Sequence, residues 1–200
     1  MHQSSRDNDG HPTLSALFED AVRLQNGGQF AEAIVIYNEI ISLEPNLPGV
    51  HSNLGNIFNT LGRFSEAEKA LRKAILLKPD FAVAYSNLGN ALKDLGRLQE
   101  AEAAHRHAIA LNPGLPEAHS NLGVTLVALG KLESAEKAYR QAIRLKPDLA
   151  SAYSNLGLLL GELGRFADAR DAADQAVRRA PRDTRYLHNL GWLKKFEAGV

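Results

Sequence analysis

A repeat of 34 residues is the feature that most constrains how this chain folds. The sequence Ala-Tyr-Ser-Asn-Leu-Gly begins at Ala84, and close copies begin at Ala118 and Ala152. Aligned without gaps, residues 82–115 and 116–149 are identical at 18 of 34 positions. A fixed period of this length predicts stacked units that bury each other's apolar faces, and each unit contacts only its neighbours.

Each unit has the pattern of two helices. Tyr85, Leu88 and Leu92 recur at helical spacing and define one apolar face. Gly96 is placed to end this first helix, because glycine readily adopts the left-handed conformation of a helix terminus. A second apolar-periodic segment follows and cannot continue through Pro113. The sequence therefore predicts an all-α chain of antiparallel helix pairs.

Small residues recur on both helices of each pair. A glycine inside a helix costs about 0.5–1 kcal/mol relative to alanine, so its repetition implies a gain in packing. We expect the second helix of each pair to pass too close to these glycines for a side chain to fit. The glycines are Gly55, Gly89, Gly123 and Gly157, and the facing small residues are Ala33, Ala67, Ala101, Ala135 and Ala169.

Composition narrows the function classes. The chain has 23 basic and 23 acidic residues, so its formal net charge is zero, and it has no cysteine. We therefore expect no nucleic-acid partner, no thiolate metal site and no thiol nucleophile. Because no phosphate loop, metal motif or nucleophile motif appears, we also expect no catalytic residue and no cofactor. The apolar runs are too short for a membrane span, and the polar residues 1–12 predict a disordered leader and a cytoplasmic protein.

The repeat resembles the tetratricopeptide repeat (TPR), whose motif positions are occupied here by Tyr85, Leu88, Gly89, Leu92, Gly96, Ala101, His105, Ala108 and Pro113. This resemblance implies a right-handed superhelical solenoid of antiparallel helix pairs with a concave groove lined by the first helices. It covers a domain at 13–198, in which the first repeat is degenerate at Asp20 and Ala21. About five repeats are expected, at 14–47, 48–81, 82–115, 116–149 and 150–183, followed by a capping helix at 184–198.

Asparagine recurs on the face of the first helices that the resemblance assigns to the groove. An asparagine amide has both donors and an acceptor, so it can pair with a peptide main chain whatever the side chains are. We predict that this ladder binds an extended peptide, although the same amides could instead only link neighbouring helices. The predicted peptide-binding residues are Asn53, Asn56, Asn87, Asn90, Asn121, Asn155 and Asn189, with Ser86, Ser120, Ser154, Val124 and Leu158 beside them.

This asparagine column resembles the ladder in the TPR arrays of O-linked N-acetylglucosamine transferases. The leading hypothesis is a non-catalytic module that binds a protein or peptide. The alternative is the substrate-recognition arm of a larger glycosyltransferase-like or sulfotransferase-like protein, because residues 189–196 also resemble the exit of bacterial arrays that precede a sulfotransferase-like domain. A third hypothesis is a scaffold that self-associates through Trp192 and Phe196. We favour the simpler interpretation that these two residues are buried against a neighbour.

Basic residues also recur once per repeat, at the turn between the two helices. These residues are Arg63, Arg97, Lys131 and Arg165. They could attract an acidic partner, but acidic residues lie between them along the sequence. We therefore interpret the basic stripe as a solvated turn.

Overall fold

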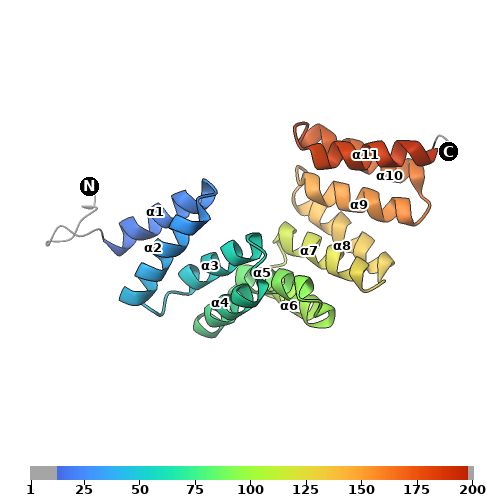
Figure 1. The fold of residues 1–200 in the computed structure, drawn as a ribbon. Coiled ribbons are helices and arrows are strands. Elements are labelled where there is room, and N and C mark those ends of the chain that lie inside the picture. Colours follow the sequence, from blue (N-terminus) through green and yellow to red (C-terminus); the bar gives the residue numbers. More distant parts are fainter. Residues whose placement is uncertain (1–12, 198–200) are drawn as a thin grey trace. The chain divides into compact units, whose positions relative to one another are not determined.

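In this computed structural model, residues 13–197 are described, apart from the side chains of Leu190 and of residues 192–197. The described part consists of eleven helices of 13 or 14 residues, with no strand (Figure 1). The predicted all-α fold of antiparallel helix pairs followed by a C-terminal helix is confirmed. The predicted leader at 1–12 lies outside the described residues. Within the described range, no helix has both the length and the apolar character needed to cross a membrane.

The chain divides into two compact units, and the first comprises residues Met1–Leu95. Its core is formed where the first and second helices of each pair meet, and Tyr37, Ile40 and Ile57 are completely buried there. Phe18 packs edge-on against the Tyr37 ring, with 6.2 Å between the ring centroids. The helices of this unit are α1 (Leu14–Asn26), α2 (Phe30–Leu43), α3 (Pro48–Thr60), α4 (Phe64–Leu77) and α5 (Ala82–Asp94).

The second unit comprises Gly96–Val200. Leu126, Tyr139 and Leu159 lie in its core, and the alanines of α8 and α10 pack around them. The helices of this unit are α6 (Leu98–Leu111), α7 (Pro116–Ala128), α8 (Leu132–Leu145), α9 (Ala150–Glu162), α10 (Phe166–Arg179) and α11 (Thr184–Glu197).

The turns between paired helices require glycine. Gly62 has a φ of 72° and Gly130 also has a φ of 72°, in the left-handed region that other residues rarely adopt. The main-chain N–H of Arg63 donates to the carbonyl of Phe58 at 2.8 Å, and Lys131 donates to Leu126 at 2.9 Å. These bonds close the first helix in the way that a left-handed terminal glycine permits.

The glycines inside the first helices meet the second helices as expected. A Cβ atom at Gly55 would lie 2.4 Å from a Leu71 carbon, and one at Gly123 would lie 2.5 Å from the Tyr139 ring. At Gly157 the nearest atom is instead a main-chain oxygen, that of Ala169, at 3.0 Å. The second helix therefore approaches each of these glycines closely, but different atoms make the contact in different repeats.

Candidate functional site

The asparagine column lies on one face of the first helices, and we call this surface the ladder face. In unit 1 it is carried by α3 and α5, which contact each other; in unit 2 it is carried by α7, α9 and α11, in which α9 contacts both neighbours. The helix packing thus brings successive asparagines side by side within a unit. Asn56 is exposed, and the other predicted asparagines are half-buried.

One ladder amide is engaged inside the protein. The Nδ2 atom of Asn53 donates to the Tyr37 hydroxyl at 3.0 Å, and that hydroxyl donates to Oε1 of Gln25 at 2.9 Å. Burial raises the pKa of the Tyr37 hydroxyl, and this effect is larger than the opposite effect of the Asn53 bond. The hydroxyl therefore stays protonated at neutral pH, and Asn53 links α3 to α2.

The serines beside the ladder are also directed inward. Ser86, Ser120 and Ser154 are exposed by only 4, 5 and 4%. The Oγ atom of Ser154 accepts a 2.9 Å hydrogen bond from Nδ2 of Asn189, which joins α11 to α9. These serines offer little surface to a ligand, and Asn189 has part of its hydrogen-bonding capacity engaged within the fold.

Asn59 shows the kind of bond that the ladder hypothesis requires. Its Nδ2 atom donates to the main-chain carbonyl of Asn87 at 2.9 Å. A side-chain amide on α3 thus binds a peptide group on α5. Asn56 and Asn90 lie on the same two helices, within one turn of this bond. Asn56 is exposed and Asn90 is half-buried.

In unit 2 the ladder face is more apolar. Val124 and Leu158 are both half-buried, and Val124 packs against the core of the unit. A hollow of about 440 Å³ on α11 is lined by Thr184, Arg185, His188 and Asn189. The ladder face of this unit therefore combines amides with partly exposed aliphatic side chains. Trp192 and Phe196, predicted for self-association, have side chains outside the described residues.

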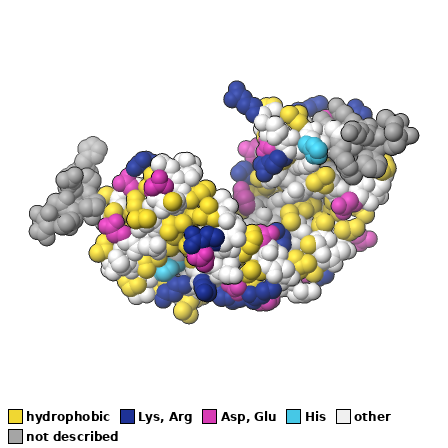
Figure 2. All heavy atoms as spheres, in the orientation of Figure 1, with side chains coloured by type: hydrophobic (Ala, Val, Ile, Leu, Met, Phe, Trp, Pro, Cys, Tyr) yellow, Lys and Arg dark blue, Asp and Glu magenta, His cyan; other side chains and the backbone are white. Residues whose placement is uncertain are grey.

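The basic stripe is paired with acidic side chains. Arg63 binds Glu66, and Arg165 binds both Asp168, at 2.7 Å, and Glu136 of the preceding repeat, at 2.8 Å. Basic and acidic side chains are correspondingly intermingled on the face shown in Figure 2. The stripe therefore contributes ion pairs within and between repeats.

Glu102 provides a test of these inter-repeat ion pairs. It is 13% exposed and accepts from Lys131 at 2.6 Å and from Arg106 at 2.9 Å. The Lys131 bond is the main reason that the pKa of Glu102 lies below its ordinary value of 4.5, although burial opposes the shift. A depressed carboxyl pKa gives stability that is present above the unfolded-state pKa and is lost as pH falls through the folded-state value.

Replacing Glu102 with glutamine should therefore lower the free energy of unfolding at pH 7 by a few tenths to about 1 kcal/mol, because the basic partners are half exposed. The difference from wild type should shrink below about pH 4.5. Urea titrations followed by circular dichroism between neutral and acidic pH measure both effects. Glu133→Gln, at an exposed site on α8, is the control. A constant difference at all pH values would contradict the ion-pair explanation.

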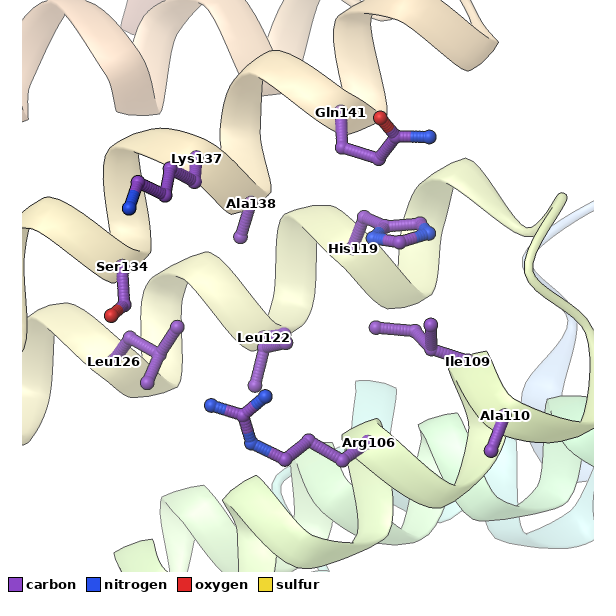
Figure 3. Close-up of a pocket in the computed structure, with 10 residues that line it drawn as sticks. All are labelled: Arg106, Ile109, Ala110, His119, Leu122, Leu126, Ser134, Lys137, Ala138 and Gln141. Carbon is purple, nitrogen blue, oxygen red and sulfur yellow. The ribbon is translucent and has the colours of Figure 1, made fainter.

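A groove of about 470 Å³ lies on another side of unit 2, between α6, α7 and α8 (Figure 3). Sequence reasoning did not identify it, because its lining comes from three helices of two repeats. A signal was nevertheless present, since Lys137 stands where Asp171 stands in the next repeat. The lining residues are Arg106, Ile109, Ala110, His119, Leu122, Leu126, Ser134, Lys137, Ala138 and Gln141.

The comparisons with known proteins agree with this helix-pair architecture. Residues 3–186 match the family model described as the cilia and flagella-associated protein 70 C-terminal domain, which is a TPR family. A search of the curated proteins finds no match.

Solved structures of TPR proteins have a similar fold. TTC0263 of Thermus thermophilus is 21% identical with a TM-score of 0.81, over 90% of this chain and 98% of that chain. MamA is 28% identical with a TM-score of 0.66, over 83% of this chain and 97% of that chain. YrrB, described as a TPR protein with an unusual peptide-binding site, is 21% identical with a TM-score of 0.62, over 88% and 91%.

The matched family and the solved structures together establish the class of the chain. It is a TPR module of the protein-interaction class, and the predicted TPR resemblance is confirmed. The closer likeness to the arrays of O-linked N-acetylglucosamine transferases rests on the asparagine column and stays a prediction. With residues 3–186 matched, the chain belongs to the family of the cilia and flagella-associated protein 70 C-terminal domain.

Proposed function

We propose that this chain is a non-catalytic module that binds an extended peptide segment of a partner protein on its ladder face. The observation that carries the proposal is the recurrence of an asparagine at one position of successive first helices, which the packing brings side by side. The bond from Asn59 to the carbonyl of Asn87 links α3 to α5 and shows that an amide on these helices can reach a main-chain carbonyl. YrrB, described as having a peptide-binding site, has a similar fold.

The structure refines which residues we assign to the ligand. Asn56, Asn87 and Asn90 in unit 1, and Asn121 and Asn155 in unit 2, are proposed to bond the peptide main chain. Val124 and Leu158 are proposed to contact an apolar side chain of the ligand. We leave the three serines out because they are buried, and we assign Asn53 and Asn189 mainly to helix linkage.

This proposal requires no catalytic domain. The transferase-arm hypothesis and self-association through Trp192 and Phe196 both stay predictions, because no contact of the described residues favours either. Peptide binding on the ladder face is compatible with each of them. The experiment below tests the binding surface alone.

The test uses peptides selected from a random display library against the full chain. If amides read the main chain, N-methylation of alternate peptide bonds in a selected peptide should abolish binding. Single alanine substitutions in the peptide should have small effects, except at the apolar side chain proposed to contact Val124 and Leu158. Isothermal titration calorimetry measures the affinities. Peptides that tolerate N-methylation throughout would overturn main-chain recognition.

A triple variant within unit 1, Asn56→Ala, Asn87→Ala and Asn90→Ala, tests whether the binding surface lies there. Each hydrogen bond contributes about 0.5–1.5 kcal/mol, and 1.4 kcal/mol corresponds to tenfold, so the triple variant should bind at least ~10-fold more weakly. Asn38→Ala is the matched control, because Asn38 is exposed on α2, a second helix. Equal loss in the control, or no loss in the triple variant, would contradict the assignment.

A further inference from the structure

We propose a second binding site in the groove between α6, α7 and α8, which takes an acidic protein segment that carries one large apolar side chain. The site differs from the ladder face in position and in chemistry, and it does not depend on the proposed function. Three observations carry the inference: an apolar floor, a basic rim without an acidic lining residue, and the different charges at the same positions of the next repeat.

The floor of the groove is apolar. Leu122 and Leu126 of α7 lie at its base, with Ala138 of α8 on one side and Ile109 and Ala110 of α6 on the other (Figure 3). A volume of about 470 Å³ is ample for one leucine or phenylalanine side chain with the adjoining main chain. Burying such a side chain against this floor removes apolar surface from water and so favours binding.

The rim of the groove is basic. Arg106 extends from α6 toward Leu122, while Lys137 and Gln141 extend from α8 (Figure 3). None of the ten lining residues is acidic. Arg106 is bound to Glu102, which lies outside the lining, whereas Lys137 makes no ion pair with any residue between 13 and 197 that the structure describes. The charge available to a ligand is therefore positive and is centred on Lys137.

His119 adds a polar contact to the groove. The side chain lies on α7 between α6 and α8 (Figure 3), and its Nε2 atom lies 3.0 Å from the carbonyl oxygen of Pro113. His51 occupies the same position two repeats earlier, and its Nε2 atom lies 2.9 Å from the carbonyl oxygen of Pro45. Ser134 at the other end provides a hydroxyl. Ser134 and Lys137 are three residues apart on α8, so both could donate to one carboxylate.

The charge of this groove differs from that of the next repeat. One repeat later, the positions of Ser134 and Lys137 are held by Asp168 and Asp171. There the tyrosine that replaces His119, Tyr153, is covered by the guanidinium of Arg179 at 4.1 Å from the ring centroid. An acidic segment would be repelled at that later position and attracted at this one.

The two proposed sites lie on opposite sides of α7. Successive residues are rotated by 100° about a helix axis, which places Leu122 and Leu126 each about 160° from the mean direction of Asn121, Val124 and Val127. A peptide on the ladder face therefore leaves the groove accessible. The module could hold two segments at once, one through its main chain and one through its charge and an apolar side chain.

The test is methyl NMR of the full chain, titrated with the peptide Glu-Asp-Leu-Phe-Asp-Glu blocked at both ends. We expect saturable shifts of the Ile109, Leu122 and Leu126 methyl groups, with a Kd of ~1 mM or tighter and weaker binding at high salt. A peptide with lysine at the four acidic positions should not bind. Shifts confined to the ladder face would overturn the proposal, and so would equal binding of the lysine peptide.

Lys137→Asp is the decisive variant, because Asp171 shows that a repeat of this chain accommodates aspartate at that position. This variant should weaken binding of the acidic peptide at least ~5-fold and leave the binding of ladder-face ligands unchanged. Lys69→Asp, at the same position of α4 in unit 1, is the matched control and should change nothing. A hexathymidylate that binds better than the peptide would assign the groove to nucleic acid and overturn the proposal.

Discussion

Replacing Tyr139 with alanine should lower the free energy of unfolding by about 3–5 kcal/mol, the usual cost of removing a large buried aromatic side chain. Tyr139 is 2% exposed and lies in the core of unit 2, with its ring against Gly123. Since that glycine has no side chain, it cannot fill the space that the ring leaves. Urea denaturation followed by circular dichroism measures the loss.

Two controls separate loss of the buried ring from the general effect of shortening an apolar side chain. Tyr139→Phe keeps the ring and should cost far less than the alanine variant at neutral pH. Leu76→Ala removes an aliphatic side chain that is exposed on α4 and should change stability by less than about 0.5 kcal/mol. A loss below about 1 kcal/mol in Tyr139→Ala would contradict the packing described for unit 2.

Replacing Gly123 with alanine should destabilise the chain by about 1–3 kcal/mol, although alanine is the better helix former. The added Cβ atom would lie 2.5 Å from Cε1 and 2.7 Å from Cδ1 of the Tyr139 ring. Because the ring is buried, it can yield only by displacing its own neighbours. Thermal and urea denaturation measure this loss.

The two substitutions should not be additive. In the Tyr139→Ala background the clash disappears, so Gly123→Ala should cost little there or should be favourable through helix propensity. Gly157 is the contrasting case, since a Cβ atom there would meet the main-chain oxygen of Ala169 at 3.0 Å and the nitrogen of Ala173 at 3.3 Å. No side-chain truncation relieves that contact. Additive losses at Gly123 and Tyr139 would contradict the proposed clash.

The helix pairs could be predicted from the sequence because the signals repeat. The 34-residue period, the turn glycines such as Gly130 and the glycines inside helices all indicate the same arrangement, and the structure has it. What could not be predicted was the atom that fills the space at each glycine. The identity of that atom depends on whether the second helix carries Tyr139 or Ala173 at the facing position. It therefore also depends on how closely the two helices approach each other.

The candidate site could be predicted only in part. Helical spacing placed the asparagines on one face, but it could not show that Asn53 bonds Tyr37 or that Asn189 bonds Ser154. Those partners come from a neighbouring helix, whose register is set by packing. The α6–α8 groove was missed for the same reason, since Arg106, His119 and Lys137 are brought together only when three helices assemble.

The side-chain amide NMR signals of the ladder asparagines, recorded with and without a selected peptide, test the central claim most directly. Each amide that bonds a peptide main chain should shift, and its protons should exchange more slowly with water. We expect such changes at the asparagines assigned to the ligand, which are Asn56, Asn87, Asn90, Asn121 and Asn155, with Asn38 unchanged. Saturable peptide binding that leaves those five amides unchanged would contradict the proposal that the ladder face reads a peptide main chain.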